Sequence, residues 1–465
     1  MRGPSHKTFC LMATQQPTGG QPSQQPSCIT LVSVGSRGDV VPYINFGLAL
    51  QAAGHKVRIC CETRYRALVE DENQLEFGLI YGDSVGLIHT KEGASALETS
   101  NLFKLISLTK AWDAKFSKDE LLASYVSALA GSDVIITGGL SLTMAMCVAE
   151  YMRVPCIPMI LGPTVPTADF PIWPLASIAC CACMNSWTYR FLFRTLWSQE
   201  KGFIQPWRHA VLGLPPWELK DGTYDLLKNR DIIIACSAIM CPAGRPRDYG
   251  DNVHMRGFIP PPIIKNADPS VVAFIAAARA SESKLVYMGF GSMPCAEPSR
   301  LLQLAVDVCK QCSVKAVLLT AWAEEMGAEK LSAVAETICI VHSAPHDWLF
   351  PQMDCLVHHC GIGTTAAALR SGVPQVPCPF GLDQPHNARQ LVRLHVAPCV
   401  VPYSASLSAA ALGRAVGMVL MNEGGCVEAA RAARAIVARE EEESADAYVR
   451  VVEMSILPRL RGTKN

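Results

Sequence analysis

The sequence predicts an α/β protein built from two doubly wound parallel sheets. Three observations support this fold class: short apolar segments alternate with helical segments, the alternation occurs twice, and a Pro-rich stretch at 259–264 (IPPPII) separates the two runs. Strands that alternate with helices form parallel sheets, because each helix crosses back over the sheet. The chain of 465 residues is long enough for two or three domains of about 150 residues each.

The first run begins with the apolar segment CITLVSV at 28–34, which is followed by GSRGD. We expect a helix at 42–53, because proline suits a first helical turn and Gly54 stands just past the end. The next apolar segment, KVRIC at 56–60, completes a strand–helix–strand unit. Further strands are expected at 133–137, 155–161 and 231–235.

The second run begins with LVYMGF at 285–290, a strand that leads directly into a glycine-bearing turn. A helix is expected near 300–312. Further strands are expected at 315–319, 338–341, 355–357 and 375–378. The repeated pattern predicts two Rossmann-like domains that face a cleft. Ligands of such sheets bind at the carboxyl ends of the strands, where the loops after residues 34, 290 and 357 would lie.

Composition suggests how the chain is divided. The first residues are rich in Gln, Pro, Gly and Ser, which predicts a disordered arm. The sequence beyond residue 427 is rich in Ala, Arg and Glu, which predicts a long helix with a charged face. We therefore expect an N-terminal arm at 1–27, an N-terminal Rossmann-like domain at 28–245, a C-terminal Rossmann-like domain at 246–427, and a helix and tail at 428–465.

Charge and cysteine content narrow the class of protein. Basic and acidic residues both number 41, so no nucleic-acid partner is expected. The 20 cysteines lie mostly in apolar runs such as 178–184, where cysteine acts as a small hydrophobe. With no hydrophobic signal core at the N-terminus, free thiols in a reducing cytoplasm are expected. The longest apolar segment, 172–184, is about 13 residues, too short to span a bilayer but able to lie peripherally on a membrane surface.

The loop after the strand at 285–290 contains GFGSMP. Its glycines let the backbone approach a ligand closely, and the hydroxyl of Ser292 can donate to a phosphate oxygen. The lysine of a P-loop and the third glycine of a dinucleotide fingerprint are both missing, which disfavours those two functions. The alternative is a tight turn between strand and helix.

The stretch HHCGIGTT at 358–365 places Gly361 and Gly363 at the start of a helix. A helix start offers free N–H groups and the positive end of the helix dipole, which suits a diphosphate. His359 can add a hydrogen-bond donor. No metal site is expected, because adjacent ligands such as His359 and Cys360 cannot easily converge on one ion.

Two further polar pairs lie near the predicted cleft. Asp383 and Gln384 follow a Pro-Phe-Gly turn and could bind the vicinal hydroxyls of a sugar, or simply cap a loop. Ser36 and Asp39 follow the first strand. A plain alternative for Asp39 is the N-cap of the helix expected from Pro42.

The segments GSRGDV, VYMGFGSMP, PHDWLFP and HHCGIGTTAAALRSGVPQVPCPFGLDQP, in this order, resemble the GT-B glycosyltransferases. They are most similar to the sterol 3-β-glucosyltransferase-like group, which uses UDP-sugars. The segment at 186–217 resembles that group's linker, and the resemblance covers about residues 28–430. It implies that the domain at 28–245 binds the acceptor and the domain at 246–427 binds the UDP-sugar. The donor is a substrate, so no cofactor is implied.

The resemblance also implies roles for individual residues in binding the donor. Two glycine loops would contact the UDP phosphates through Gly291, Ser292, His359, Gly361, Gly363 and Thr364. Asp383 and Gln384 would hold the sugar hydroxyls. Uracil would be held by Trp322 or by the backbone near Ala344 and Pro345.

For the reaction, the resemblance implies that Ser36 and Asp39 lie near the acceptor hydroxyl, with Asp39 as the general base. The sequence has no D-x-D pair for Mg²⁺, so a metal-independent, inverting displacement is expected. The acceptor should be an apolar molecule with one hydroxyl, in first place a sterol, with other membrane lipids and polyketides as the alternatives. Five tryptophans between 165 and 220 could line such a pocket, or form ordinary packing: Trp173, Trp187, Trp197, Trp207 and Trp217.

The sequence departs from the sterol group at four positions. That group more often has glycine at the positions of Cys360 and Leu382, and an aromatic pair at the positions of His386 and Asn387. These departures leave two other functions open: a UDP-sugar- and lipid-binding protein with impaired turnover, and a UDP-sugar epimerase. An NAD-dependent oxidoreductase is disfavoured, because the three-glycine fingerprint is missing.

Overall fold

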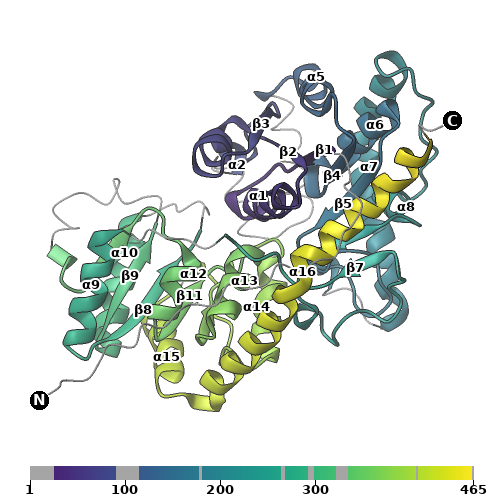
Figure 1. The fold of residues 1–465 in the computed structure, drawn as a ribbon. Coiled ribbons are helices and arrows are strands. Elements are labelled where there is room, and N and C mark those ends of the chain that lie inside the picture. The colour runs from purple at the N-terminus through teal and green to yellow at the C-terminus, as the bar shows by residue number, and fades with distance from the viewer. Residues whose placement is uncertain are drawn as a thin grey trace, which may run out of the picture.

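The computed structural model describes residues 26–88, 90, 115–176, 181–262, 268–291, 298–320, 333–404 and 407–462. It contains two parallel sheets, one of seven strands and one of five, as the sequence predicts. The first lies at the upper right of Figure 1 and the second at the lower left. Both sheets are flanked by helices, so the doubly wound α/β class is confirmed.

The first sheet has the strand order β3-β2-β1-β4-β5-β6-β7. Its strands are β1 (Cys28–Val32), β2 (Lys56–Cys61), β3 (Glu76–Leu79), β4 (Val134–Thr137), β5 (Cys156–Ile160), β6 (Ile232–Ile234) and β7 (Val253–Met255). Its helices are α1 (Arg37–Ala52), α2 (Ser84–Ile88), α5 (Lys118–Leu129), α6 (Leu142–Met152), α7 (Asn185–Ala210) and α8 (Thr223–Leu227). Short turns of helix follow at η1 (Thr63–Tyr65), η2 (Leu68–Glu72), η3 (Gly139–Ser141), η4 (Trp173–Leu175), η5 (Ala182–Met184) and η6 (Ala238–Met240). The last strand, β7, lies beyond residue 245, where we expected the N-terminal domain to end.

The second sheet has the strand order β10-β9-β8-β11-β12. Its strands are β8 (Lys284–Gly289), β9 (Val314–Leu319), β10 (Ile338–Val341), β11 (Cys355–His358) and β12 (Gln375–Pro377). Its helices are α9 (Pro269–Ala280), α10 (Pro298–Cys312), α12 (His346–Leu349), α13 (Ile362–Ser371), α14 (Gln384–Arg393), α15 (Ala409–Leu420) and α16 (Cys426–Gly462), with short turns at η8 (Phe350–Gln352) and η9 (Glu423–Gly425).

The first helix begins five residues earlier than the sequence predicted. α1 starts at Arg37 with Ser36 as its N-cap, and Pro42 lies inside the helix. The reason is a capping box: the Asp39 carboxylate accepts a hydrogen bond from the backbone N–H of Ser36 at 2.7 Å. The expectation that Asp39 could be the N-cap of a helix starting at Pro42 is therefore wrong.

A shared apolar core joins the two halves of the chain. Ile234 and Phe258 of the first half pack in one buried cluster with Leu369 and Leu391 of the second. Figure 1 shows α16, in yellow, running from the second sheet across to the first. The two halves of the chain are therefore in direct apolar contact.

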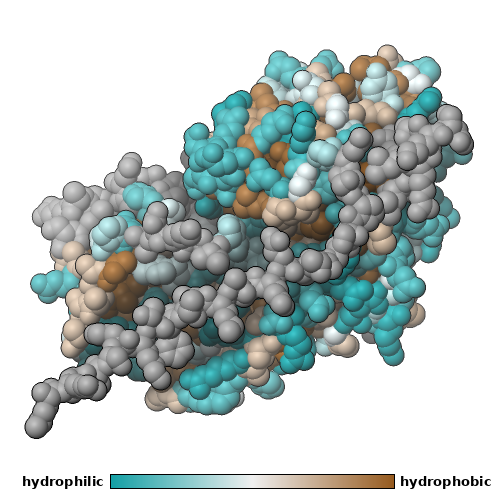
Figure 2. All heavy atoms as spheres, viewed as in Figure 1, coloured by the Kyte–Doolittle hydropathy of each residue, from teal (hydrophilic) through white to brown (hydrophobic). Residues whose placement is uncertain are grey.

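The surface of the protein is mostly hydrophilic on the face that Figure 2 shows. On the face drawn in Figure 2, hydrophilic residues cover most of the described surface, and hydrophobic ones show in scattered groups, some of them over the first sheet. No helix of the described residues is both long enough and apolar enough to cross a membrane.

Tyr448 attaches α16 to the first sheet. Its side chain is fully buried, and its hydroxyl accepts from the backbone N–H of Arg256 at 2.8 Å. The same hydroxyl lies 2.8 Å from the carbonyl oxygens of Ile234 and Gly257, to which it can donate.

We expect Tyr448→Phe to lower the free energy of unfolding by about 1–3 kcal/mol, because it leaves buried backbone groups without a partner. Chemical denaturation measures the change. Tyr151→Phe is the matched control, since Tyr151 is exposed on α6. Equal stability of the two variants would contradict this role for Tyr448.

Candidate active site

The predicted site lies where the start of α1 meets the start of α13. These helices follow β1 and β11, so both loops stand at the carboxyl ends of their strands. The approach is close: a Cβ atom added to Gly363 would lie 3.8 Å from the Cα of Gly38. The two sheets therefore bring the GSRGD and HHCGIGTT segments together, as expected.

His359 occupies the space between the two glycine loops. A Cβ atom on Gly291 would lie 2.8 Å from Nε2 of the His359 imidazole, and one on Gly361 only 2.5 Å from it. Any side chain at either position would collide with the ring. Gly291 and Gly361 are therefore needed to make room for the His359 ring. The close approach of a ligand would be a second reason for glycine at these positions.

The imidazole of His359 is held in its neutral form. Burial, with smaller contributions from the neighbouring imidazoles of His358 and His346, lowers its pKa to about 3. Its Nδ1 atom is buried without a hydrogen-bond partner among the described residues. A neutral imidazole carries one N–H, which at Nε2 can donate to a phosphate oxygen.

His358 has a structural role. It is fully buried, its Nε2 lies 2.8 Å from the side-chain oxygen of Gln375, and its Nδ1 accepts from the backbone N–H of Cys360 at 3.1 Å. The latter bond fixes Nε2 as the protonated nitrogen. Both ring nitrogens are therefore used within the protein, and burial lowers the pKa of His358 to about 4.

Cys360 adopts a left-handed conformation with φ of +67°. Glycine tolerates this conformation best, which explains why the similar sterol group more often has glycine there. The carbonyl of Cys360 accepts from the side-chain amide of Asn387 at 3.0 Å, which stabilises the strained turn. Leu382 also has a positive φ, +57°, and the same explanation applies to it.

The start of α13 is open toward the junction. Gly361 is its N-cap and supplies no side chain, so the first-turn N–H groups, those of Gly363 and Thr364 among them, have no side-chain cap. Such N–H groups and the helix dipole together favour an anion. The predicted phosphate-binding residues His359, Gly361, Gly363 and Thr364 thus form one continuous surface.

Asp383 has a carboxylate oxygen available for a ligand, whereas the side-chain oxygen of Gln384 is used within the protein. The Gln384 oxygen accepts from the backbone N–H groups of Phe380 at 2.9 Å and Gly381 at 3.4 Å, so it stabilises the Pro-Phe-Gly turn. One Asp383 carboxylate oxygen accepts from Asn387 at 2.9 Å. Burial, with a smaller contribution from the Asp39 carboxylate, raises the pKa of Asp383 to about 6, against the lowering effect of the Asn387 hydrogen bond. The acidic side chains of the two domains are therefore within electrostatic reach of each other.

Asp39 is positioned by Ser36. The same Asp39 oxygen that accepts from the Ser36 N–H accepts from the Ser36 hydroxyl at 2.9 Å. Burial raises the pKa of Asp39 above its ordinary value, and the bonds from Ser36 partly offset this. A raised pKa makes the carboxylate a stronger base than a solvated aspartate.

Some predicted residues cannot be placed. Ser292 and Trp322 lie outside the described residues. Gly291, at the end of the β8 loop, has a φ of +64°, which favours glycine. Ala344 and Pro345 immediately precede α12 and are partly exposed.

The tryptophans expected to line an acceptor pocket have several roles. Trp197 and Trp207 are buried in the core between α7 and the first sheet. Trp217 donates from its ring N–H to Glu150 at 2.8 Å. Trp173 packs beside α7. Trp187 is exposed. The alternative of ordinary packing therefore holds for most of the five.

Sequence reasoning missed two residues at the junction. Arg37, in the first turn of α1, directly precedes Gly38, which approaches Gly363 of the second domain. Burial is the main cause that lowers the pKa of His346 to about 4, and the charge of Arg37 contributes a smaller part. His386 was noted only as a departure; its ring lies 6.5 Å from that of Phe170, across the junction. Arg37 lies in the quoted GSRGDV segment and His386 directly follows the quoted segment that ends at Pro385, but neither shows its partner in the sequence.

No group of three or more His, Cys, Asp or Glu that could hold a metal ion occurs in the part of the chain that the structure describes.

Two family domains match this chain. Residues 29–168 match the glycosyltransferase family 28 N-terminal domain, and residues 312–448 match the C-terminal domain of erythromycin biosynthesis protein CIII-like proteins. Together these matches cover more than half of the chain.

Curated relatives point the same way. The chain is 29% identical over 408 residues to a sterol 3-beta-glucosyltransferase of Glomerella lagenarium, which covers 84% of this chain and 26% of that protein. It is 32% identical over 375 residues to a sterol 3-beta-glucosyltransferase of Neurospora crassa, covering 77% and 23% respectively. The chain therefore spans about a quarter of the length of these relatives.

Solved structures share the fold. The glycotransferase of kitacinnamycin has a TM-score of 0.62 at 18% identity, covering 93% of this chain and 100% of that one. Glycosyltransferase VinC in complex with dTDP has a TM-score of 0.58 at 16% identity, covering 92% and 100%. The fold is thus GT-B, and the chain belongs to the family 28, EryCIII-like glycosyltransferases, with distant homology to sterol 3-beta-glucosyltransferases over most of its length.

The packing of His359 against Gly361 gives a direct test of the site's geometry. We expect Gly361→Ala to lower the free energy of unfolding by about 1–3 kcal/mol, because the new methyl group collides with the imidazole. The backbone φ of Gly361 is −58°, so no conformational strain is added.

In a His359→Ala background the same substitution should cost almost nothing, and this coupling is measured by a double-mutant cycle of denaturation experiments. Gly162→Ala is the control, since no atom lies within 4 Å of its added Cβ. An equal loss from Gly361→Ala in both backgrounds would show that the ring does not lie between the loops.

Proposed function

We propose that this protein transfers a hexose, in first place glucose, from a UDP-sugar to the hydroxyl of an apolar acceptor such as a sterol. The observation that carries the proposal is the meeting of two helix starts: Gly38, which directly precedes Asp39 in α1, approaches Gly363 at the start of α13, which has no side-chain cap. The names of the curated relatives support glucose and sterol as the substrates.

In the proposed reaction, the Asp39 carboxylate takes the proton of the acceptor hydroxyl as its oxygen attacks the anomeric carbon. The bond from that carbon to the diphosphate oxygen breaks, and its electron pair leaves with UDP. Attack from the side opposite the leaving group inverts the configuration. The domain at 28–245 binds the acceptor and the domain at 246–427 binds the donor.

The charge on the departing UDP is stabilised by groups of this chain. The N–H groups of Gly363 and Thr364 and Nε2 of His359 would contact the diphosphate. Arg37 adds a positive charge from the facing domain. With these groups in place, the reaction is proposed to need no metal ion.

Asp383 would bind the sugar hydroxyls through the carboxylate oxygen that does not accept from Asn387. Gln384 supports this contact mainly by holding the turn before it, because its oxygen accepts from that turn. Ser36 positions Asp39 through two hydrogen bonds.

Replacing the base tests the proposal. We expect Asp39→Asn to lower the rate of glucose transfer to a sterol by about 10²- to 10⁴-fold, the range for loss of a general base. Affinity for UDP should not change. Transfer is measured by extraction of labelled lipid after incubation with labelled UDP-glucose, and affinity by calorimetry.

Asp119→Asn is the matched control, on the exposed first turn of α5. Full turnover by Asp39→Asn would remove Asp39 from the reaction. Tight UDP binding by the unaltered protein, without a labelled product from any hydroxylated lipid, would favour a binding protein. A new UDP-sugar isomer formed without acceptor would favour an epimerase.

A further inference from the structure

Two aromatic side chains stack on the outer surface of α7. Trp187 and Phe191 stand one helical turn apart, with ring centroids 5.1 Å apart and planes at 22°. They are 45% and 42% exposed. Two large aromatic rings that are stacked and exposed on one face of a helix indicate a contact surface.

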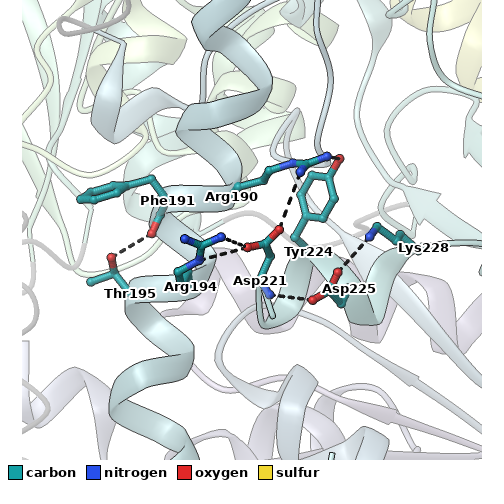
Figure 3. Close-up of polar contacts among 8 residues, drawn as sticks. All are labelled: Arg190, Phe191, Arg194, Thr195, Asp221, Tyr224, Asp225 and Lys228. Carbon is teal, nitrogen blue, oxygen red and sulfur yellow. Dashed lines mark hydrogen bonds and ion pairs between the residues drawn. The ribbon is translucent and has the colours of Figure 1, made fainter. Parts of the chain in front are cut away.

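The same face carries two arginines and no carboxylate. Arg190 and Arg194 alternate with the aromatic residues, and the first 15 residues of α7 contain no Asp or Glu. Their partner carboxylate, Asp221, lies beneath them: Arg194 pairs with it at 2.5 Å and Arg190 lies 3.9 Å from it. Figure 3 shows both arginines directed toward Asp221, while Phe191 points away from it.

The charges are layered with the cations outermost. The side chains of Arg190 and Arg194 are 49% and 57% exposed, but that of Asp221 is only 4% exposed. The same order holds for Lys228, 54% exposed, over Asp225, 19% exposed. Tyr224 supports this layer, because its ring lies 4.9 Å from the guanidinium of Arg190 and 5.2 Å from the Lys228 ammonium. The surface therefore presents positive charge beside apolar rings.

The other side of α7 connects this surface to the junction. The backbone N–H of Ile172 donates to the Thr188 hydroxyl at 3.0 Å, and Asn185 donates to the carbonyl of Ala168 at 2.8 Å. The segment held in this way includes Phe170, whose ring approaches that of His386, three residues after Asp383. A molecule entering beside α7 would therefore be close to the acceptor side of the junction.

We propose that the outer face of α7, formed by Trp187, Arg190, Phe191 and Arg194, docks on the surface of an anionic lipid bilayer. A helix with aromatic residues and cations on one face lies in the plane of a membrane interface, where aromatic rings enter the headgroup boundary and cations meet anionic lipids. The charge complementarity selects an anionic bilayer over a protein partner with an apolar surface. The inference does not depend on which acceptor is glycosylated.

Sedimentation with sucrose-loaded vesicles tests the docking, using the full chain without donor or acceptor. We expect binding to phosphatidylcholine vesicles in which roughly one lipid in three is anionic phosphatidylserine. Binding to vesicles of phosphatidylcholine alone should be much weaker. Raising the salt concentration should weaken binding further, because exposed charges are screened.

Two double variants separate the apolar and the charged parts. Arg190→Gln with Arg194→Gln should weaken binding by about fivefold for each arginine lost. Trp187→Ser with Phe191→Ser should weaken it at least as much, and should remove the blue shift of tryptophan fluorescence on adding vesicles. Thermal unfolding and UDP affinity of the Trp187/Phe191 variant should match the unaltered protein, since these side chains are exposed. The arginine variant leaves the buried Asp221 carboxylate without its cations and should unfold at a lower temperature, so its vesicle binding is measured where UDP affinity shows that it is folded.

Matched controls come from exposed residues of the second domain. They are Val272→Ser with Met421→Ser, and Arg414→Gln with Arg431→Gln. Vesicle binding that is absent, or that all variants retain equally, would overturn the proposal. Self-association in light scattering that the α7 variants abolish, without vesicle binding, would instead assign the face to a second copy of this chain. Failure of glucose transfer alone would leave the docking result unaffected.

Discussion

The buried imidazole of His359 is the constraint on which the centre of this molecule depends. It fills the space between the loops after β8 and β11, and neither loop could carry a side chain at Gly291 or Gly361 without displacing it. The ring is neutral, and its Nδ1 has no hydrogen-bond partner among the described residues. In the proposed function the other ring nitrogen, Nε2, donates to a phosphate at the start of α13. Packing and phosphate binding are thus two consequences of the same geometry.

The first domain supplies the candidate base, Asp39. Asp39 is kept partly desolvated and receives two hydrogen bonds from Ser36 on one oxygen. For Asp383, from the second domain, burial is the main cause that raises the pKa, and the Asp39 carboxylate adds to it. Such an arrangement requires the sheets to be held at a fixed distance. The shared apolar core and the attachment of α16 through Tyr448 provide this.

Much of this arrangement could be predicted from the sequence. The alternation of strands and helices gave both sheets, and the glycine loops were predicted at the carboxyl ends of strands. The start of α1 was predicted wrongly, because the proline at position 42 was weighed above the Ser36–Asp39 capping box. The role of the glycines was predicted only in part, since the contact of Gly291 with His359 joins two separate loops. Likewise, of five tryptophans close in sequence, Trp197, Trp207 and Trp217 pack in one cluster and Trp187 is exposed, which composition alone does not reveal.

The most direct test of the central claim is the affinity of UDP for His359→Ala, measured by calorimetry. A hydrogen bond to a charged phosphate predicts a dissociation constant about 10- to 100-fold higher than that of the unaltered protein. His342→Ala, at an exposed histidine of the same domain, should bind UDP as the unaltered protein does. A folded His359→Ala protein that binds UDP within about twofold of the unaltered affinity would contradict the assignment of this histidine to the diphosphate.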